Sequence, residues 1–166
     1  MCQKAFEEIG APPFDDQDEK LAARFRSTFS QDDIESVGKD IVALGGDPAL
    51  IPESEILHRS VLPYFPLDKC MGGSTDVGDA SYCAPTSQMN VATCALGTPG
   101  HSWQLTAQSN SPLAEKGTMT AAKVLALAAA ELLDQPETLA AARRELNVKT
   151  GGAYHCPIPP EVGPTL

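Results

Sequence analysis

The sequence predicts an α/β fold in which helices pack on a small sheet. Apolar residues recur at helical spacing near the start of the chain and through its last third, whereas residues 80–97 between them have the pattern of extended segments. The chain has 166 residues, of which 42% are hydrophobic, so it is long enough to bury one core. We therefore expect a single α/β domain.

The first predicted helix covers residues 16–29. Residues 14–19 supply N-cap candidates and acids that suit the positive end of the helix dipole, and Phe25 and Phe29 then follow at helical spacing. Residues 31–71 contain repeated prolines and glycines. We expect them to form a long ordered loop that covers a site or packs on something outside the chain.

Two extended segments are predicted in the middle of the chain. Residues 81–86 have the pattern of a short strand or turn, with pairing limited by Pro85. Residues 89–96 alternate partly between apolar and polar side chains and end at Gly97. We interpret them as a buried strand that delivers residues 97–101 at its carboxyl end, the usual place for a site in an α/β sheet.

The last third of the chain is predicted to be helical. Residues 118–133 form an alanine-rich apolar pattern, which favours close packing on a sheet or on another helix. Pro136 suits the first turn of a second helix, which we expect to end near Gly151. The proline-rich tail from His155 to Pro160 is expected to lie extended on the surface.

Charge and cysteine content narrow the functional classes. The formal net charge is −10, so we expect no nucleic-acid partner. No apolar run reaches the roughly 20 residues that span a bilayer, and no hydrophobic signal segment is seen, so no membrane partner is expected. The five cysteines are odd in number and lie far apart, which favours a reducing, cytoplasmic setting.

Two glycine-framed segments are the strongest candidates for a functional site, residues 72–79 and residues 97–104. Glycine lets a ligand approach the backbone closely. A structural turn rarely needs two acids, a histidine and the only tryptophan of the chain together. The candidate residues of the two segments are Ser74, Thr75, Asp76, Asp79, Gly100, His101 and Ser102.

His101 is the sharpest of these candidates. Neutral imidazole is a common metal ligand, and the position after a predicted strand favours that role over an ordinary loop histidine. Asp76 and Asp79 suit a capped turn as well as a carboxylate that orients a ligand. These three residues do not complete a catalytic zinc site, which needs about three protein ligands. A pair of His101 with Cys83 or Cys94 lacks any recognisable flanking pattern.

The same segments resemble a known family. Residues 73–82 and 96–104 are similar to the C-terminal part of aminobenzoyl-glutamate hydrolase-like proteins, in the zinc-dependent aminoacylase and carboxypeptidase superfamily of metallopeptidases. Residues 9–14 and 154–159 resemble that subfamily too, so the resemblance covers nearly the whole chain. It implies that residues 1–166 are the C-terminal half of an α/β catalytic domain, without its N-terminal half and its inserted lid domain.

The resemblance also implies an activity and a cofactor. The family hydrolyses amide bonds of N-acyl or N-aroyl amino acids and small peptides at a dinuclear centre of zinc or manganese. His101 matches the family's last metal ligand, and Asp76, with Ser74, Thr75 and Asp79, matches an acidic turn that lines the site. The other ligands and the general-base glutamate match nothing in this chain, so none of its residues is assigned a catalytic role.

Two functional hypotheses follow. The first is a fragment of a metal-dependent amidohydrolase that acts on a small-molecule amide when complete and is inactive, with no tightly bound metal, when alone. The alternative is a non-catalytic interaction module that forms a homo-oligomer or pairs with a separate partner subunit.

Overall fold

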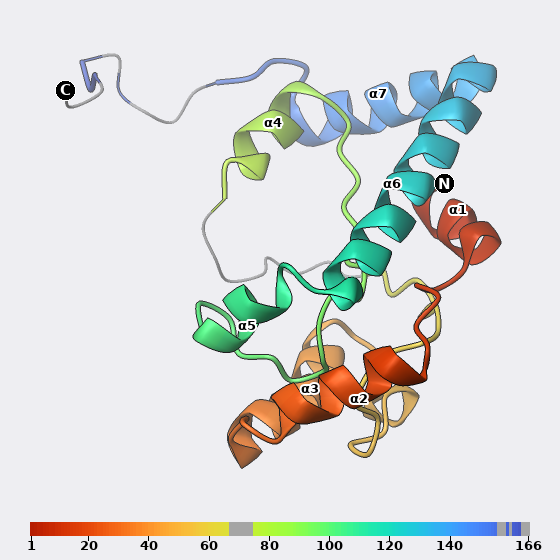
Figure 1. Ribbon diagram of the computed structural model, residues 1–166. Coiled ribbons are helices and arrows are strands. Elements are labelled where there is room, and N and C mark those ends of the chain that lie inside the picture. The colour runs from red at the N-terminus through yellow and green to blue at the C-terminus, as the bar shows by residue number, and fades with distance from the viewer. Residues whose placement is uncertain (67–74, 156–158, 160, 164–166) are drawn as a thin grey trace. The chain divides into compact units, whose positions relative to one another are not determined.

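The computed structural model describes residues 1–66, 75–155, 159 and 161–163 (Figure 1). Within these ranges the structure is built from helices, and no described residue lies in a strand. The elements are α1 (Cys2–Ile9), α2 (Asp16–Arg26), α3 (Gln31–Ala43), a short 3-10 helix η1 (Pro48–Leu50), α4 (Val77–Cys83), α5 (Trp103–Gln108), α6 (Pro112–Asp134) and α7 (Pro136–Thr150). The predicted α/β fold, with helices packed on a small sheet, is therefore wrong.

The helices belong to two compact units. The first unit comprises Met1–Cys70 and Met89–Ala130, and the second comprises Met71–Gln88 and Glu131–Leu166. The first unit contains α1, α2, α3, α5 and most of α6. The second contains α4, α7 and the end of α6.

In the core of the first unit, α2, α6 and three connecting segments pack around one apolar cluster. Its buried members are Phe14, Ala22, Leu57, Ala95 and Leu113. The predicted first helix is confirmed as α2, although it ends at Arg26 rather than at residue 29. Phe29 lies beyond the helix and still packs against the cluster.

The segment predicted as a buried strand, residues 89–96, is an irregular connecting segment in which Ala95 is buried, Asn90 is exposed and the other residues are half-buried. Its backbone makes isolated contacts rather than a ladder: the Leu96 amide donates to the Ile56 carbonyl at 2.9 Å, and the Ala95 amide donates to the Gln108 side chain at 2.8 Å. An extended segment that packs one side against helices has the same alternation of apolar and polar residues as a strand. The prediction of a strand is therefore wrong, and within residues 89–96 full burial is confirmed for Ala95 alone.

The other predicted extended segment, residues 81–86, overlaps a helix over its first half. Residues up to Cys83 belong to α4, and only the residues that follow are irregular. The helix is short and exposed, with no buried side chain to impose a periodic pattern on its sequence.

The long loop predicted over residues 31–71 contains a helix that the proline and glycine count concealed. α3 begins with a capping box, in which the Ser30 side chain accepts from the Asp33 amide and the Asp33 carboxylate accepts from the Ser30 amide. This spacing of a serine and an acid is a recognised signal for a helix start. Of the described residues after Ala43 in this segment, 44–66, those outside η1 are irregular or lie in turns.

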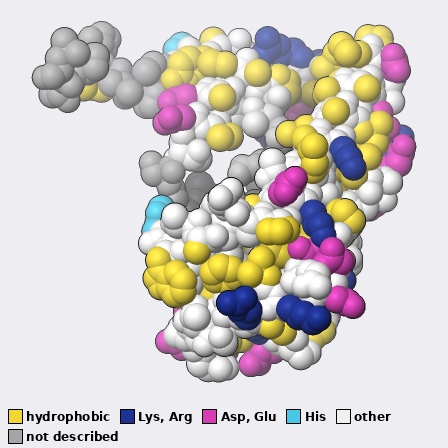
Figure 2. Space-filling view, in the orientation of Figure 1, with side chains coloured by type: hydrophobic (Ala, Val, Ile, Leu, Met, Phe, Trp, Pro, Cys, Tyr) yellow, Lys and Arg dark blue, Asp and Glu magenta, His cyan; other side chains and the backbone are white. Residues whose placement is uncertain are grey.

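The alanine-rich helix is confirmed as α6, and its predicted close packing is against another helix. Val124 and Ala128 of α6 form a buried cluster with Ala5 of α1. Met119 and Leu125 of the same helix are 56% and 55% exposed, and Figure 2 shows apolar side chains on the surface among the charged ones. In the part of the chain that the structure describes, no helix has both the length and the hydropathy of a membrane span.

In the second unit, α7 has the ends that the sequence predicts. Pro136 occupies its first turn, and Gly151 caps it in the left-handed region at φ 71°. The Arg143 side chain of α7 donates to the Cys83 carbonyl at the end of α4, at 3.0 Å. Most of the tail predicted to lie extended falls outside the described residues.

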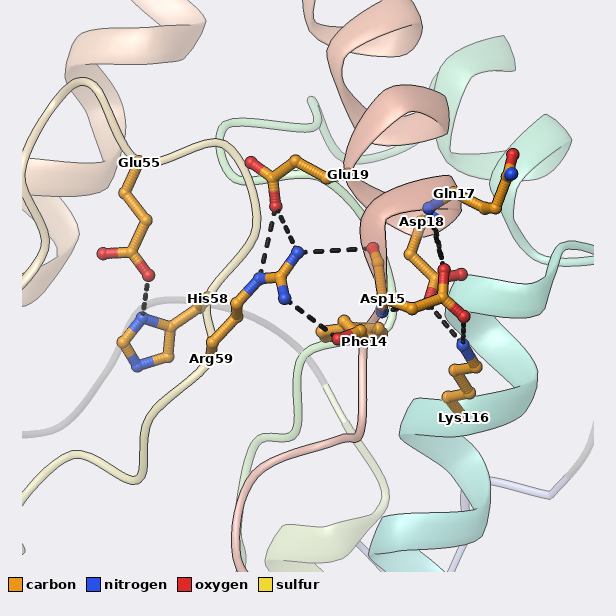
Figure 3. A network of polar contacts seen from close by, with 9 residues as sticks. All are labelled: Phe14, Asp15, Gln17, Asp18, Glu19, Glu55, His58, Arg59 and Lys116. Carbon is orange, nitrogen blue, oxygen red and sulfur yellow. Dashed lines mark hydrogen bonds and ion pairs between the residues drawn. The ribbon is translucent and has the colours of Figure 1, made fainter.

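A polar network ties α2 of the first unit to α6 and to the segment around Arg59 (Figure 3). The Lys116 ammonium of α6 binds the carboxylates of Asp15 and Asp18. The Arg59 guanidinium binds the Glu19 carboxylate at 2.8 Å and the Phe14 carbonyl at 2.9 Å. The N-terminal end of α2 is therefore held on two sides.

The network makes stability sensitive to acid. The hydrogen bond from Lys116, together with those from the backbone amides of Asp18 and Gln17, lowers the pKa of Asp15 from 3.8 to about 2. Because the folded pKa lies below the ordinary value, this contribution is present above about pH 4 and is lost as the pH falls toward about 2.

We therefore expect the free energy of unfolding, measured in urea, to fall between about pH 4 and pH 2, and to fall less steeply in a Lys116→Met variant. Lys20→Met, which changes an exposed lysine of α2, is the control and should retain the wild-type slope. Equal slopes for the wild type and Lys116→Met would contradict the assignment.

Candidate functional site

His101 lies in the turn that leads into α5, in the first unit. Its side chain is exposed, and its φ of 53° makes it the non-glycine residue with positive φ in the described part of the chain. Histidine is among the side chains found in this region more often than most, but such a conformation still costs on the order of 1 kcal/mol. The fold therefore holds His101 in a position that presents its imidazole to solvent.

The residues beside His101 explain how this turn is formed. The Ser102 hydroxyl caps α5 by accepting from the Leu105 amide at 3.1 Å, and it donates to the Pro99 carbonyl at 2.6 Å. Gly97 at the start of the turn has φ 81°, and a Cβ there would lie 2.9 Å from the Asp33 carbonyl oxygen. A glycine is required at this position both by the backbone angle and by the close approach of α3.

Gln108 holds the same turn through side-chain hydrogen bonds, a role that the sequence did not predict. Its side chain is fully buried; it accepts from the Ala95 amide at 2.8 Å and donates to the Thr98 hydroxyl at 3.0 Å. The Thr98 hydroxyl in turn donates to the Ala95 carbonyl at 2.6 Å. No local pattern distinguishes this glutamine from a surface one, because its role depends on partners that only the fold brings to it.

The second candidate segment belongs to the second unit. Thr75, Asp76 and Asp79 are exposed around the first turn of α4, and Ser74 lies outside the described residues. Asp76 occupies the N-cap position without a side-chain cap bond. Asp79 accepts from the Tyr154 hydroxyl at 2.9 Å, so its carboxylate orients a tyrosine rather than capping the helix.

The described residues do not by themselves fit a metal centre. Within the described ranges, no group of three or more histidine, cysteine, aspartate or glutamate side chains lies together so that it could hold a metal ion. A catalytic zinc site needs about three protein ligands. Among the described residues, His101 is therefore not part of a complete set of metal ligands.

His58 is more enclosed than a surface histidine. Its side chain is 12% exposed, and its Nδ1 lies 2.9 Å from the Glu55 carboxylate (Figure 3). Its Nε2 lies 3.3 Å from the Ser60 hydroxyl. These contacts join near neighbours in sequence, and Arg26 fixes the same segment by donating to the Glu55 carbonyl at 3.0 Å. We assign this group a structural role in holding the segment around Leu57.

The comparisons with known proteins give one informative result. No family model matches the chain, and no solved structure matches it. Among curated proteins, a subunit of p-aminobenzoyl-glutamate hydrolase from Escherichia coli (strain K12) is 32% identical over 167 residues. The alignment covers 98% of this chain and 35% of that protein, so the chain spans about a third of its relative's length.

The resemblance carried by the two glycine-framed segments is thereby confirmed: along nearly its whole length, the chain is similar to a p-aminobenzoyl-glutamate hydrolase subunit.

Proposed function

We propose that this chain is part of a metal-dependent amidohydrolase that cleaves amide bonds of N-acyl or N-aroyl amino acids or small peptides. The observation that carries the proposal is the 32% identity over 98% of the chain to a protein named as an aminobenzoyl-glutamate hydrolase subunit. Since the alignment covers only 35% of that protein, we propose that the chain is one partial catalytic domain. The missing metal ligands and the general base would come from protein outside this chain.

On this proposal His101 supplies one ligand to the metal. Its exposed imidazole, its left-handed backbone and the turn braced by Gln108 support that role. Gly100 and Ser102 beside it, and Ser74, Thr75, Asp76 and Asp79 of the other segment, would line the site. Imidazole and carboxylate ligands accept both zinc and manganese, so either metal suits this donor set.

We further propose that the chain works together with a partner, because its relative is named as one subunit of a hydrolase. The exposed apolar residues of α6, Met119 and Leu125, offer surface for such an association. A cytoplasmic setting is supported by the free thiols of Cys2, Cys83 and Cys94, since reducing compartments keep cysteines unpaired.

The purified chain alone is expected to hydrolyse no aminobenzoyl-glutamate and to retain no zinc or manganese after dialysis. The reason is that a catalytic centre needs several ligands and a base held together. The measurements are product release followed by chromatography and metal content by mass spectrometry. Metal-dependent hydrolysis by the isolated chain would show that the complete site lies within these residues.

The role of His101 is tested in a chimera in which this chain replaces the matching third of the Escherichia coli protein. We expect His101→Gly to lower hydrolysis about 100-fold or more, a loss at the upper end of that seen when a group supporting a metal ligand is removed. The same substitution should leave the stability of the isolated chain unchanged or raise it by up to about 1 kcal/mol, because glycine relieves the positive φ.

His155→Ala, which removes another exposed histidine, is the matched control and should retain activity and metal. Full metal content and activity in the His101→Gly chimera would contradict the ligand assignment.

A further inference from the structure

A pocket of about 250 Å³ lies in the second unit, where the end of α4 meets the C-terminal half of α7 and the residues after it. The residues that define its character are Tyr82, Arg143, Leu146, Asn147, Thr150 and Tyr154. Pockets for drug-sized ligands measure roughly 300–1,000 Å³, so this one suits a smaller molecule.

Two tyrosine rings form the aromatic side of the pocket. The ring centroids of Tyr82 and Tyr154 are 6.1 Å apart, and the ring planes are tilted by 34°. The Tyr154 hydroxyl donates to the Asp79 carboxylate at 2.9 Å, which orients that ring. Leu146 of α7 adds an aliphatic surface. A flat apolar ring is the chemistry that such walls contact best.

Arg143 supplies a cation to the same pocket. Its Nη1 donates to the Cys83 carbonyl at 3.0 Å, which anchors the guanidinium against the end of α4. A guanidinium has five N–H donors in a planar fork, so one backbone bond leaves donors for an anion. The fork matches two oxygens of a carboxylate or of a phosphate, and the tyrosine rings beside it favour an anion that carries an aromatic ring.

We propose that this pocket binds a small aromatic carboxylate, with its ring against Tyr82 and Tyr154 and its carboxylate on Arg143. The carboxylate points away from Asp79, which carries a negative charge and already accepts from Tyr154. This inference goes beyond the proposed function: it rests on the pocket of the second unit and holds whether or not the chain contributes to an amidohydrolase.

The test is a titration of the full chain with benzoate, followed by NMR of ring-labelled tyrosine. The chain has three tyrosines, and Tyr64, which is 72% exposed in the first unit, is an internal control. We expect the resonances of Tyr82 and Tyr154 to shift and that of Tyr64 to stay. Benzamide, which lacks the charge, should bind at least about tenfold more weakly, since a charge-assisted contact is worth about a tenfold change. Acetate keeps the charge but lacks the ring, so it should also bind more weakly than benzoate because it loses the contacts with the tyrosine rings.

The matched variants are Arg143→Gln and Arg144→Gln, two adjacent exposed arginines of α7 of which only the first lines the pocket. We expect Arg143→Gln to weaken benzoate binding about tenfold or more and Arg144→Gln to leave it unchanged. Three outcomes would overturn the proposal: no shift of Tyr82 and Tyr154 at millimolar benzoate, equal losses in both variants, or phosphate binding as tightly as benzoate. The wild-type shifts decide the question even where a variant does not fold.

Discussion

Replacing Gly117 with alanine is expected to destabilise the first unit by about 3 kcal/mol, at the upper end of the cost of overpacking. Gly117 is buried in α6, and a Cβ there would lie 2.2 Å from the Ala92 carbonyl oxygen and 2.7 Å from the Thr93 methyl group. The nearest of these atoms is the backbone carbonyl oxygen of Ala92, which a side-chain rotation cannot move. Either α6 or the segment that contains Ala92 must therefore shift. Helix propensity works in the opposite direction, because alanine is favoured over glycine by about 1 kcal/mol.

Gly38→Ala is the control for this experiment. Gly38 lies inside α3 of the same unit, and the nearest atom to its added Cβ would be the Pro48 Cβ at 3.8 Å, an ordinary contact. We expect that variant to gain up to about 1 kcal/mol from helix propensity. Urea denaturation followed by circular dichroism measures both. A gain in both variants would show that α6 does not press against Ala92.

Replacing Asp18 with alanine is expected to cost about 3 kcal/mol. Asp18 is 2% exposed, its carboxylate accepts from the Asp15 amide at 2.8 Å, and it binds the Lys116 ammonium. Removing one partner of a buried ion pair leaves the other without compensation, which costs about 3–5 kcal/mol when both partners are fully buried. The lower value is expected here because the Lys116 side chain is 27% exposed and retains Asp15.

The control is Asp16→Ala, which removes an exposed acid from the same turn of α2 and should change stability by less than about 0.5 kcal/mol. Asp18 contributes both through its ion pair with Lys116 and through its hydrogen bond from the Asp15 amide, which caps α2. A double variant, Asp18→Ala with Lys116→Met, separates these two contributions to the free energy of unfolding. The double variant should lose less than the sum of the two single losses. Strict additivity would mean that Asp18 acts through the cap alone.

The ends of several helices could be predicted because their signals are local. The acids before α2, the proline that begins α7 and the glycine that ends it each act on backbone groups within one turn. The capping box of α3, formed by Ser30 and Asp33, was equally local and was hidden only by the prolines that follow. Local chemistry also explains why the glycine-framed turn before α5 was recognised.

The candidate site was predicted in part. Its candidate residues were chosen from glycine, histidine and aspartate in short motifs, and their role at a site stays a prediction. The positive φ of His101 and the brace by buried Gln108 were not predicted, because both depend on contacts between turn and helix. The partner of Asp79, Tyr154, lies far away in the sequence and carries no local signal.

The sequence by itself determined the start of α2, both ends of α7, the two motifs and the family resemblance, since each depends on residue types at short spacing. Only the tertiary structure decided that residues 89–96 are not a strand. Alternation reports which side chains are buried, and burial between helices produces the same alternation as burial in a sheet. The two cases differ in which element packs against the backbone of the segment. The Ala92 carbonyl packs against Gly117 of α6 and not against a neighbouring strand.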